Sequence, residues 1–97
     1  MIDVKPIKIG DRIAIGVSVV MPEGPPLIFI RGERGILFCG YLNADAAEKF
    51  GLAAAIVRGV ASVEDALCAR VSYCTKKAES FGVQIGMTGK EALSLLL

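Results

Sequence analysis

The sequence predicts an α+β fold, in which a β-rich N-terminal region of strands and a hairpin is followed by a helix-rich C-terminal half packed on the sheet. Hydrophobic residues alternate with period two in the first part of the chain, and capping residues precede short apolar segments in the second. At 97 residues the chain has the length of one small domain. We therefore expect a single domain, 1–97, with a β-rich oligomerisation region over about 1–40 and mixed helix and strand over about 41–97.

The first clear strand runs from Ile13 to Met21. Its odd-numbered residues are large and apolar, whereas Ala14, Gly16 and Ser18 on the other face are small. A strand without a charged face is buried on both sides, and a chain of this length has limited material for covering both. We expect helices to cover one face and the sheet of a partner subunit to cover the other.

A β-hairpin follows the first strand. Glu23 to Pro26 contains consecutive prolines, which lack backbone donors, and is expected to be a loop. Leu27 to Arg31 and Ile36 to Gly40 are short apolar runs joined by a segment with glycine at both ends. Arg31 and Arg34 are expected to face solvent.

Capping residues divide the second half into short helices. Side chains of the Asn, Asp, Ser and Thr type, with acidic residues in the first turn, favour helix starts, and glycine favours helix ends. Helices are expected from Asn43 or Asp45 to Phe50, from Ser62 to about Cys68, from about Thr75 to Phe81 and from Thr88 into the terminal leucines, with a strand over Ala53 to Val60.

Composition excludes several classes of function. The net charge is +1, which disfavours non-specific nucleic-acid binding, and there is no histidine, which excludes Ser-His and Cys-His nucleophile pairs and histidine-ligated zinc. No apolar stretch has the length of a membrane-spanning helix, and we see no secretory signal, so the expected location is the cytoplasm. No pattern identifies a cofactor or a metal site.

Hydrophobic residues make up 54% of the chain, which is more than one small core requires. Large exposed apolar patches are rare on soluble monomers. Self-association into a homo-oligomer is the simplest way to cover the surplus.

Cys39 is the candidate catalytic residue. It is expected to end a strand just before a helix cap, a place where open sheets present ligand-facing groups. Its activation would need a basic side chain or a helix N-terminus nearby, because the chain has no histidine to act as a base. The alternative is a small buried residue that packs like alanine or valine.

The two other cysteines are expected to be structural. Cys68 and Cys74 are separated by five residues, which does not match the spacing of a zinc site. We expect both to line the face of the helical half as reduced thiols.

Two segments are candidates for binding a small anion. Arg58 interrupts an apolar run and is followed by glycine, so it is expected to project from a strand end, either as an anion partner or as a charge in solvent. Thr88, Gly89 and Lys90 resemble a fragment of a phosphate loop, but the Walker motif would need glycine where Gln84 stands. An ordinary capping box of Thr88 with Glu91 explains the same residues.

The order of motifs resembles the YunC-like family of bacterial and archaeal proteins, a domain of unknown function. The resemblance is carried by residues 35–43, 57–67, 81–83 and 86–93 and extends over nearly the whole chain. It implies that the N-terminal β-rich region takes part in tetramerisation. It also places Cys39, Gly40 and the glycines of 86–89 at motif positions, and Lys90 where a basic residue, often arginine, is expected.

Two functional hypotheses remain open at this point. The first is a cytoplasmic homo-oligomeric assembly or binding module, since catalytic groups are missing and apolar residues are in surplus; the resemblance implies that this oligomer is a homotetramer. The second is a small-anion-binding protein or a thiol-dependent enzyme that uses Cys39, with Arg58 or Lys90 holding the anion.

Overall fold

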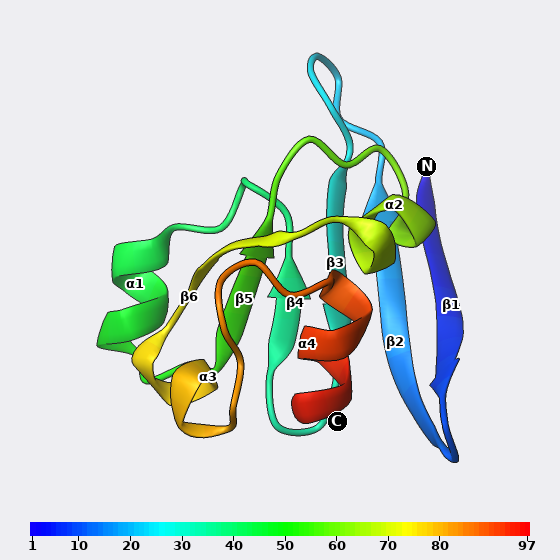
Figure 1. Ribbon diagram of the computed structural model, residues 1–97. Helices are drawn as coiled ribbons and strands as arrows, with labels where there is room; N and C mark the ends of the chain where they lie inside the picture. Colours follow the sequence, from blue (N-terminus) through cyan, green and yellow to red (C-terminus); the bar gives the residue numbers. More distant parts are fainter.

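A computed structural model describes all 97 residues of the protein. Six strands form one sheet whose spatial order follows the chain order. The strands are β1 (Ile2–Ile9), β2 (Arg12–Val19), β3 (Leu27–Arg31), β4 (Ile36–Phe38), β5 (Ala54–Val57) and β6 (Val71–Cys74), and the helices are α1 (Ala44–Lys49), α2 (Val63–Cys68), α3 (Lys76–Ser80) and α4 (Gly89–Leu95) (Figure 1). The fold is therefore α+β, as the sequence predicts.

All strand pairs are antiparallel except β4 and β5, which are parallel. A parallel pair needs a crossover connection, and α1 provides it between these two strands. This one crossover determines where the candidate site lies.

The main hydrophobic core lies between the sheet and helices α2, α3 and α4, which lie on the same side of the sheet (Figure 1). Ile28, Ile30 and Leu37 from the middle strands are each at most 1% exposed and face this core together with Leu93 and Leu96. We call this side of the sheet the helix face.

The small residues of β2 let α2 approach the helix face closely. A Cβ atom on Gly16 would lie 3.1 Å from a Val63 side-chain carbon, a distance tighter than ordinary van der Waals contact. The small side of this strand is thus the side that α2 covers, and the bulky side is turned away from the helices. One half of the prediction for this strand is therefore confirmed.

Helix α1 lies on the opposite side of the sheet. Ala54 and Ile56 alternate with the core residues of β5, so they point away from the helix face, yet both are at most 1% exposed. The hydroxyl of Tyr73, which pairs with Ile56 in the sheet, donates a hydrogen bond of 2.7 Å to Glu48 of α1. Helix α1 therefore covers β5 and β6 on this side of the sheet and leaves β1 to β4 uncovered there.

The uncovered side of β1 to β4, which we call the open face, is strongly apolar. The pairing register places eleven apolar side chains on it, seven of them from β1 and β2. They are Ile2, Val4, Pro6, Ile13, Ile15, Val17, Val19, Leu27, Phe29, Ile36 and Phe38. Ile2, Val4 and Ile13 are 68%, 63% and 61% exposed. Lys8 and Arg31, the charged residues of these strands on the same side, both lie at one end of it.

Two strands were not expected from the sequence. β1 is an edge strand whose polar and apolar residues alternate around Pro6, and β6 has only four residues. The predicted strand over Ala53 to Val60 is also too long, because β5 ends at Val57 and Gly59 has a φ of 71°. Arg58 therefore lies immediately after the strand.

None of the helices is long and apolar enough to span a membrane.

The hairpin and the four helices lie where the capping and turn residues in the sequence predict them. Asn43, Ser62, Thr75 and Thr88 are the N-caps, and each side chain accepts a hydrogen bond from a backbone N–H of the first turn.

Candidate functional site

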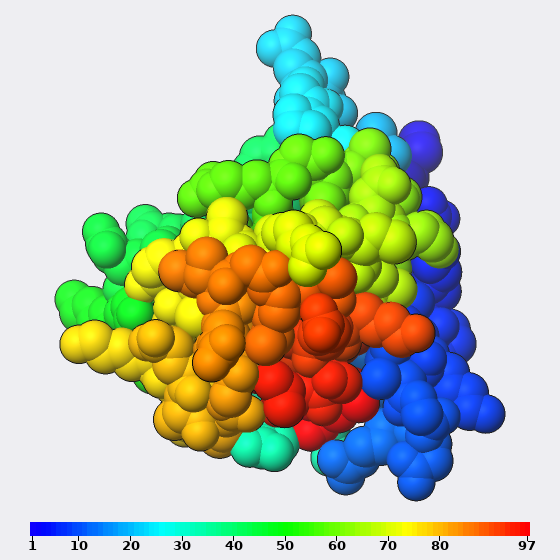
Figure 2. All heavy atoms as spheres, in the orientation of Figure 1, coloured from blue at the N-terminus to red at the C-terminus, as the bar shows by residue number.

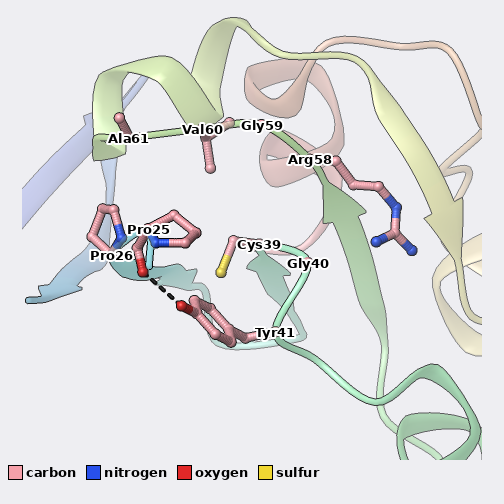
Figure 3. A pocket seen from close by; sticks show the side chains of 9 residues that line it. All are labelled: Pro25, Pro26, Cys39, Gly40, Tyr41, Arg58, Gly59, Val60 and Ala61. Atoms are coloured by element: carbon pink, nitrogen blue, oxygen red, sulfur yellow. Dashed lines mark hydrogen bonds between the residues drawn. The ribbon is translucent and has the colours of Figure 1, made fainter. Parts of the chain in front are cut away.

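A cavity of about 520 Å³ lies at the carboxyl ends of β4 and β5. Three segments line it: Pro25 and Pro26 from the β2–β3 loop, residues 39–41 after β4, and residues 58–61 after β5 (Figure 3). The structure thus brings Cys39 and Arg58, two candidates from the sequence, to the walls of one cavity.

The cavity exists because the chain leaves β4 and β5 toward opposite sides of the sheet. The segment after β4 enters α1, which lies on the side of the open face, whereas the segment after β5 enters α2 on the helix face. Two parallel neighbours whose connections diverge leave a crevice outside their carboxyl ends, and open sheets bind ligands at such crevices. If β4 and β5 were antiparallel, a short turn could join them directly and would occupy this end of the sheet.

The β2–β3 loop closes one side of the cavity. It projects from the body of the protein as an extended loop (Figures 1 and 2). The Tyr41 hydroxyl donates a hydrogen bond of 2.6 Å to the carbonyl oxygen of Pro25, which ties the loop to the segment after β4 (Figure 3). Sequence reasoning missed this contribution, because nothing in the spacing of Pro25 and Tyr41 indicates the contact.

Cys39 forms part of the inner wall. Its side chain is only 4% exposed, and its sulfur accepts a hydrogen bond from the backbone N–H of Ile28 at 3.4 Å. Figure 3 shows the sulfur directed toward the space between Pro25 and Tyr41. The residues lining the cavity include no carboxylate and no lysine that could take a proton from the thiol.

Arg58 lies at the rim, on the other side of Gly40 from the thiol (Figure 3). A Cβ atom on Gly40 would come within 3.2 Å of a guanidinium nitrogen of Arg58, so the absence of a side chain lets the arginine lie across the end of β4. Arg58 is exposed, and its guanidinium makes neither a hydrogen bond nor an ion pair within the chain. The salt bridge of the chain joins Lys5 and Glu64 instead. Arg58 is also the only charged residue that lines the cavity.

Backbone donors are available beside the arginine. The N–H groups of Gly40, Tyr41, Gly59 and Val60 donate no hydrogen bond to another backbone group of the chain, whereas that of Ala61 donates to Asp65. Together with Arg58 they give the cavity hydrogen-bond donors and one positive charge, while the prolines, Val60 and Ala61 give it apolar walls.

Thr88, Gly89 and Lys90 lie at the start of α4 and do not line this cavity. The N–H of Gly89 donates to the carbonyl of Ala69 at 2.7 Å, and the N–H of Thr88 donates to the Glu91 carboxylate at 2.9 Å. The backbone and side-chain hydrogen bonds from Thr88 lower the pKa of Glu91, which keeps a negative charge at this helix start. The capping box uses the donors that an anion would need.

The two remaining cysteines differ in burial. Cys74 is buried in β6, and burial raises the pKa of its thiol. Cys68 is exposed in the last turn of α2, so the expectation that it lines the packed face of the helical half is wrong. The turn of a helix that packs by Val63 and Ala66 carries position 68 round to the solvent side.

The chain is similar to known proteins over almost its whole length. The Uncharacterized protein YunC of Bacillus subtilis (strain 168) is 28% identical over 97 residues, which cover 96% of this chain and 95% of that protein. Among solved structures, a Protein of Unknown Function, TA1206 from Thermoplasma acidophilum, is 30% identical, covers the whole of this chain and 94% of its own, and superposes with a TM-score of 0.95. The model of the Domain of unknown function (DUF1805) matches residues 38–96, more than half of the chain, and this protein therefore belongs to the DUF1805 family of YunC-like proteins.

Proposed function

We propose that this protein is a homo-oligomeric module whose subunits join through the open face of the sheet. The observation that carries the proposal is the exposure of large aliphatic side chains there, above all Ile2, Val4 and Ile13 at more than 60% each. Contiguous apolar patches of this kind mark interaction sites on soluble proteins.

A second copy of the chain is the occupant that fits this surface best. The open face is apolar, and its charges, Lys8 and Arg31, are confined to one end. A two-fold axis near the centre of such a face would set apolar side chains against apolar side chains and keep the like charges at opposite ends. Two sheets can pack in this way at about 10 Å.

Pairing by the edge of the sheet fits less well. β1 carries Pro6, which has no backbone donor, and Lys5 and Lys8, which are residues that discourage edge-to-edge pairing. The face is therefore the surface we propose for pairing two subunits, and a two-fold contact of this kind closes at a dimer. The YunC-like resemblance implies a tetramer formed through the β-rich region, so we propose a homotetramer in which two such dimers associate through a further contact. The three unpaired cysteines fit a reducing cytoplasm.

Native mass spectrometry of the purified protein tests the proposal. We expect a mass four times that of the 10.2-kDa chain, and we expect Ile13→Glu to yield smaller species because it buries a charge in the interface. Ile85→Glu is the matched control, since Ile85 is 65% exposed, compared with 61% for Ile13, and does not belong to the open face. A monomeric wild-type protein, or dissociation by both variants alike, would refute assembly through this face.

The alternative of a thiol-dependent enzyme has less support in the geometry. The sulfur of Cys39 is buried and already accepts a hydrogen bond, and no side chain along the cavity can serve as its base. The cavity supports the other form of this alternative, in which the protein binds a small anion without using Cys39 as a nucleophile.

A further inference from the structure

The crevice between the ends of β4 and β5 has the chemistry of a binding site rather than of a packing defect. It combines one charged side chain that has no partner, several backbone donors that have no acceptor within the chain, and walls that are otherwise apolar. We propose that it binds a small organic anion, with its carboxylate or phosphate group at Arg58 and its apolar body against Pro25, Tyr41 and Val60.

The positive charge is the first support. Arg58 is the only charged residue that lines the cavity, and it forms no ion pair within the chain. The carboxylate of Asp65, which does not line the cavity, accepts a hydrogen bond from the backbone N–H of Ala61. A guanidinium presents several donors in a fixed plane and binds carboxylate or phosphate oxygens in pairs. An arginine without an ion pair at the rim of a cavity thus favours an anion over a neutral or cationic ligand.

The backbone around Arg58 is the second support. Gly40 and Gly59 stand on the two sides of the crevice, and neither has a side chain that would keep a ligand away from its N–H group. An oxygen atom placed between the strand ends can therefore approach the main chain as well as the guanidinium. Donors of both kinds are common at sites that bind anions.

The apolar walls and the volume of the cavity indicate the size and polarity of the rest of the ligand. The volume of about 520 Å³ falls within the range of small-molecule sites, and far exceeds what an inorganic ion would fill. The hydroxyl of Tyr41 donates a hydrogen bond to the carbonyl oxygen of Pro25, and the ring forms one wall of the cavity. We infer that the ligand carries an aromatic or aliphatic group beside its anionic group.

Titration of the isotope-labelled protein by NMR tests this proposal with two matched pairs of probes, benzoate against benzamide and phenyl phosphate against phenol. At millimolar concentration we expect the anionic probes to shift the amide signals of Gly40, Tyr41, Gly59 and Val60, and the neutral partners to shift them far less. Loss of the charge in Arg58→Gln should weaken binding of the anions about tenfold, while Lys90→Gln should bind as the wild type does.

Three results would overturn the proposal. They are an absence of shifts in residues 39–41 and 58–61, equal binding of charged and neutral probes, and shifts centred on residues 88–90 that are lost in Lys90→Gln. Because Arg58 is exposed and unpaired, its substitution should leave the fold intact, which the dispersion of the other amide signals will show. The result does not depend on the number of subunits, so this proposal and the proposed assembly can fail separately.

Discussion

At the scale of single residues, Glu48 connects three elements. Its carboxylate accepts a hydrogen bond from the hydroxyl of Tyr73 in β6 and from the backbone N–H of Lys76 at the start of α3. The hydrogen bond from Tyr73 is the main reason why the pKa of Glu48 lies below its ordinary value of 4.5. The same hydrogen bond raises the pKa of Tyr73 to about 12.

This pair predicts a stability change in alkaline solution. The pKa of Tyr73 is higher in the folded state than its ordinary value of 10.0, so its contribution is complete below pH 10.0 and is lost as the pH rises toward about 12. Denaturant unfolding between these pH values should show the wild type losing its advantage over Tyr73→Phe. A constant difference between the two proteins across that range would contradict the assignment.

The three thiols should differ in their rates of labelling. Cys68 is exposed, whereas Cys39 and Cys74 are 4% and 7% exposed. We expect Ellman's reagent to titrate one thiol quickly and two slowly in the folded protein, and we expect Cys68→Ser to remove the fast phase. A fast phase that persists in Cys68→Ser and disappears in Cys39→Ser would instead favour a reactive thiol in the cavity.

At the scale of elements, the side chains that cap the helices differ in how many hydrogen bonds they make. Thr75 caps α3, but its hydroxyl also accepts a hydrogen bond from the N–H of Ala54 at 3.0 Å and donates one to the carbonyl of Leu52 at 2.7 Å. Thr75 is 1% exposed, so water cannot replace these partners. Ser62, the cap of α2, accepts a single hydrogen bond from Asp65.

Thr75→Val should therefore destabilise the protein more than Ser62→Ala does. We expect about 2 to 4 kcal/mol for the first, because it leaves buried polar groups without partners, and about 1 kcal/mol for the second. Chemical denaturation of the two variants in parallel gives both values. Equal costs would mean that the hydroxyl of Thr75 acts only as a helix cap.

Local signals in the sequence were sufficient for elements with their own start and stop residues. Each of the four helices begins beside a predicted cap, since a cap satisfies its backbone donors within one turn. β1 and β6 carry no comparable signal, because a strand at the edge of a sheet is stabilised by a partner distant in the sequence. Pro6 in β1 even argues against a strand unless the edge position is known.

The candidate site could be predicted only in part, for a related reason. Cys39 and Arg58 were identifiable because glycine follows each of them after a run of apolar residues. Their proximity depends on the parallel pairing of β4 and β5, and the wall formed by Pro25 and Pro26 depends on the hydroxyl of Tyr41. The capping residues at 88–91 gave a competing signal, since helix caps and anion sites use the same residue types.

At the scale of the whole molecule, the open face predicts a stability that depends on protein concentration. Association of folded subunits stabilises them by mass action. The thermal midpoint of the wild type should rise with protein concentration, whereas that of Ile13→Glu should change little. Differential scanning calorimetry over a hundredfold range of concentration provides the test, and equal slopes would exclude Ile13 from the interface.

The order of the strands has a consequence for the kinetics of folding. Every strand pairs with the one that follows it in the chain, so most pairings in the sheet close short loops. Closing a short loop costs less conformational entropy than closing a long one, so these pairings can form early. The clearest distant contact is made after α4, where the carbonyl of Leu96 accepts hydrogen bonds from the backbone of Arg34 and Gly35. The sheet can therefore form progressively as the ribosome delivers it, and the docking of α4 becomes the late step that covers the core.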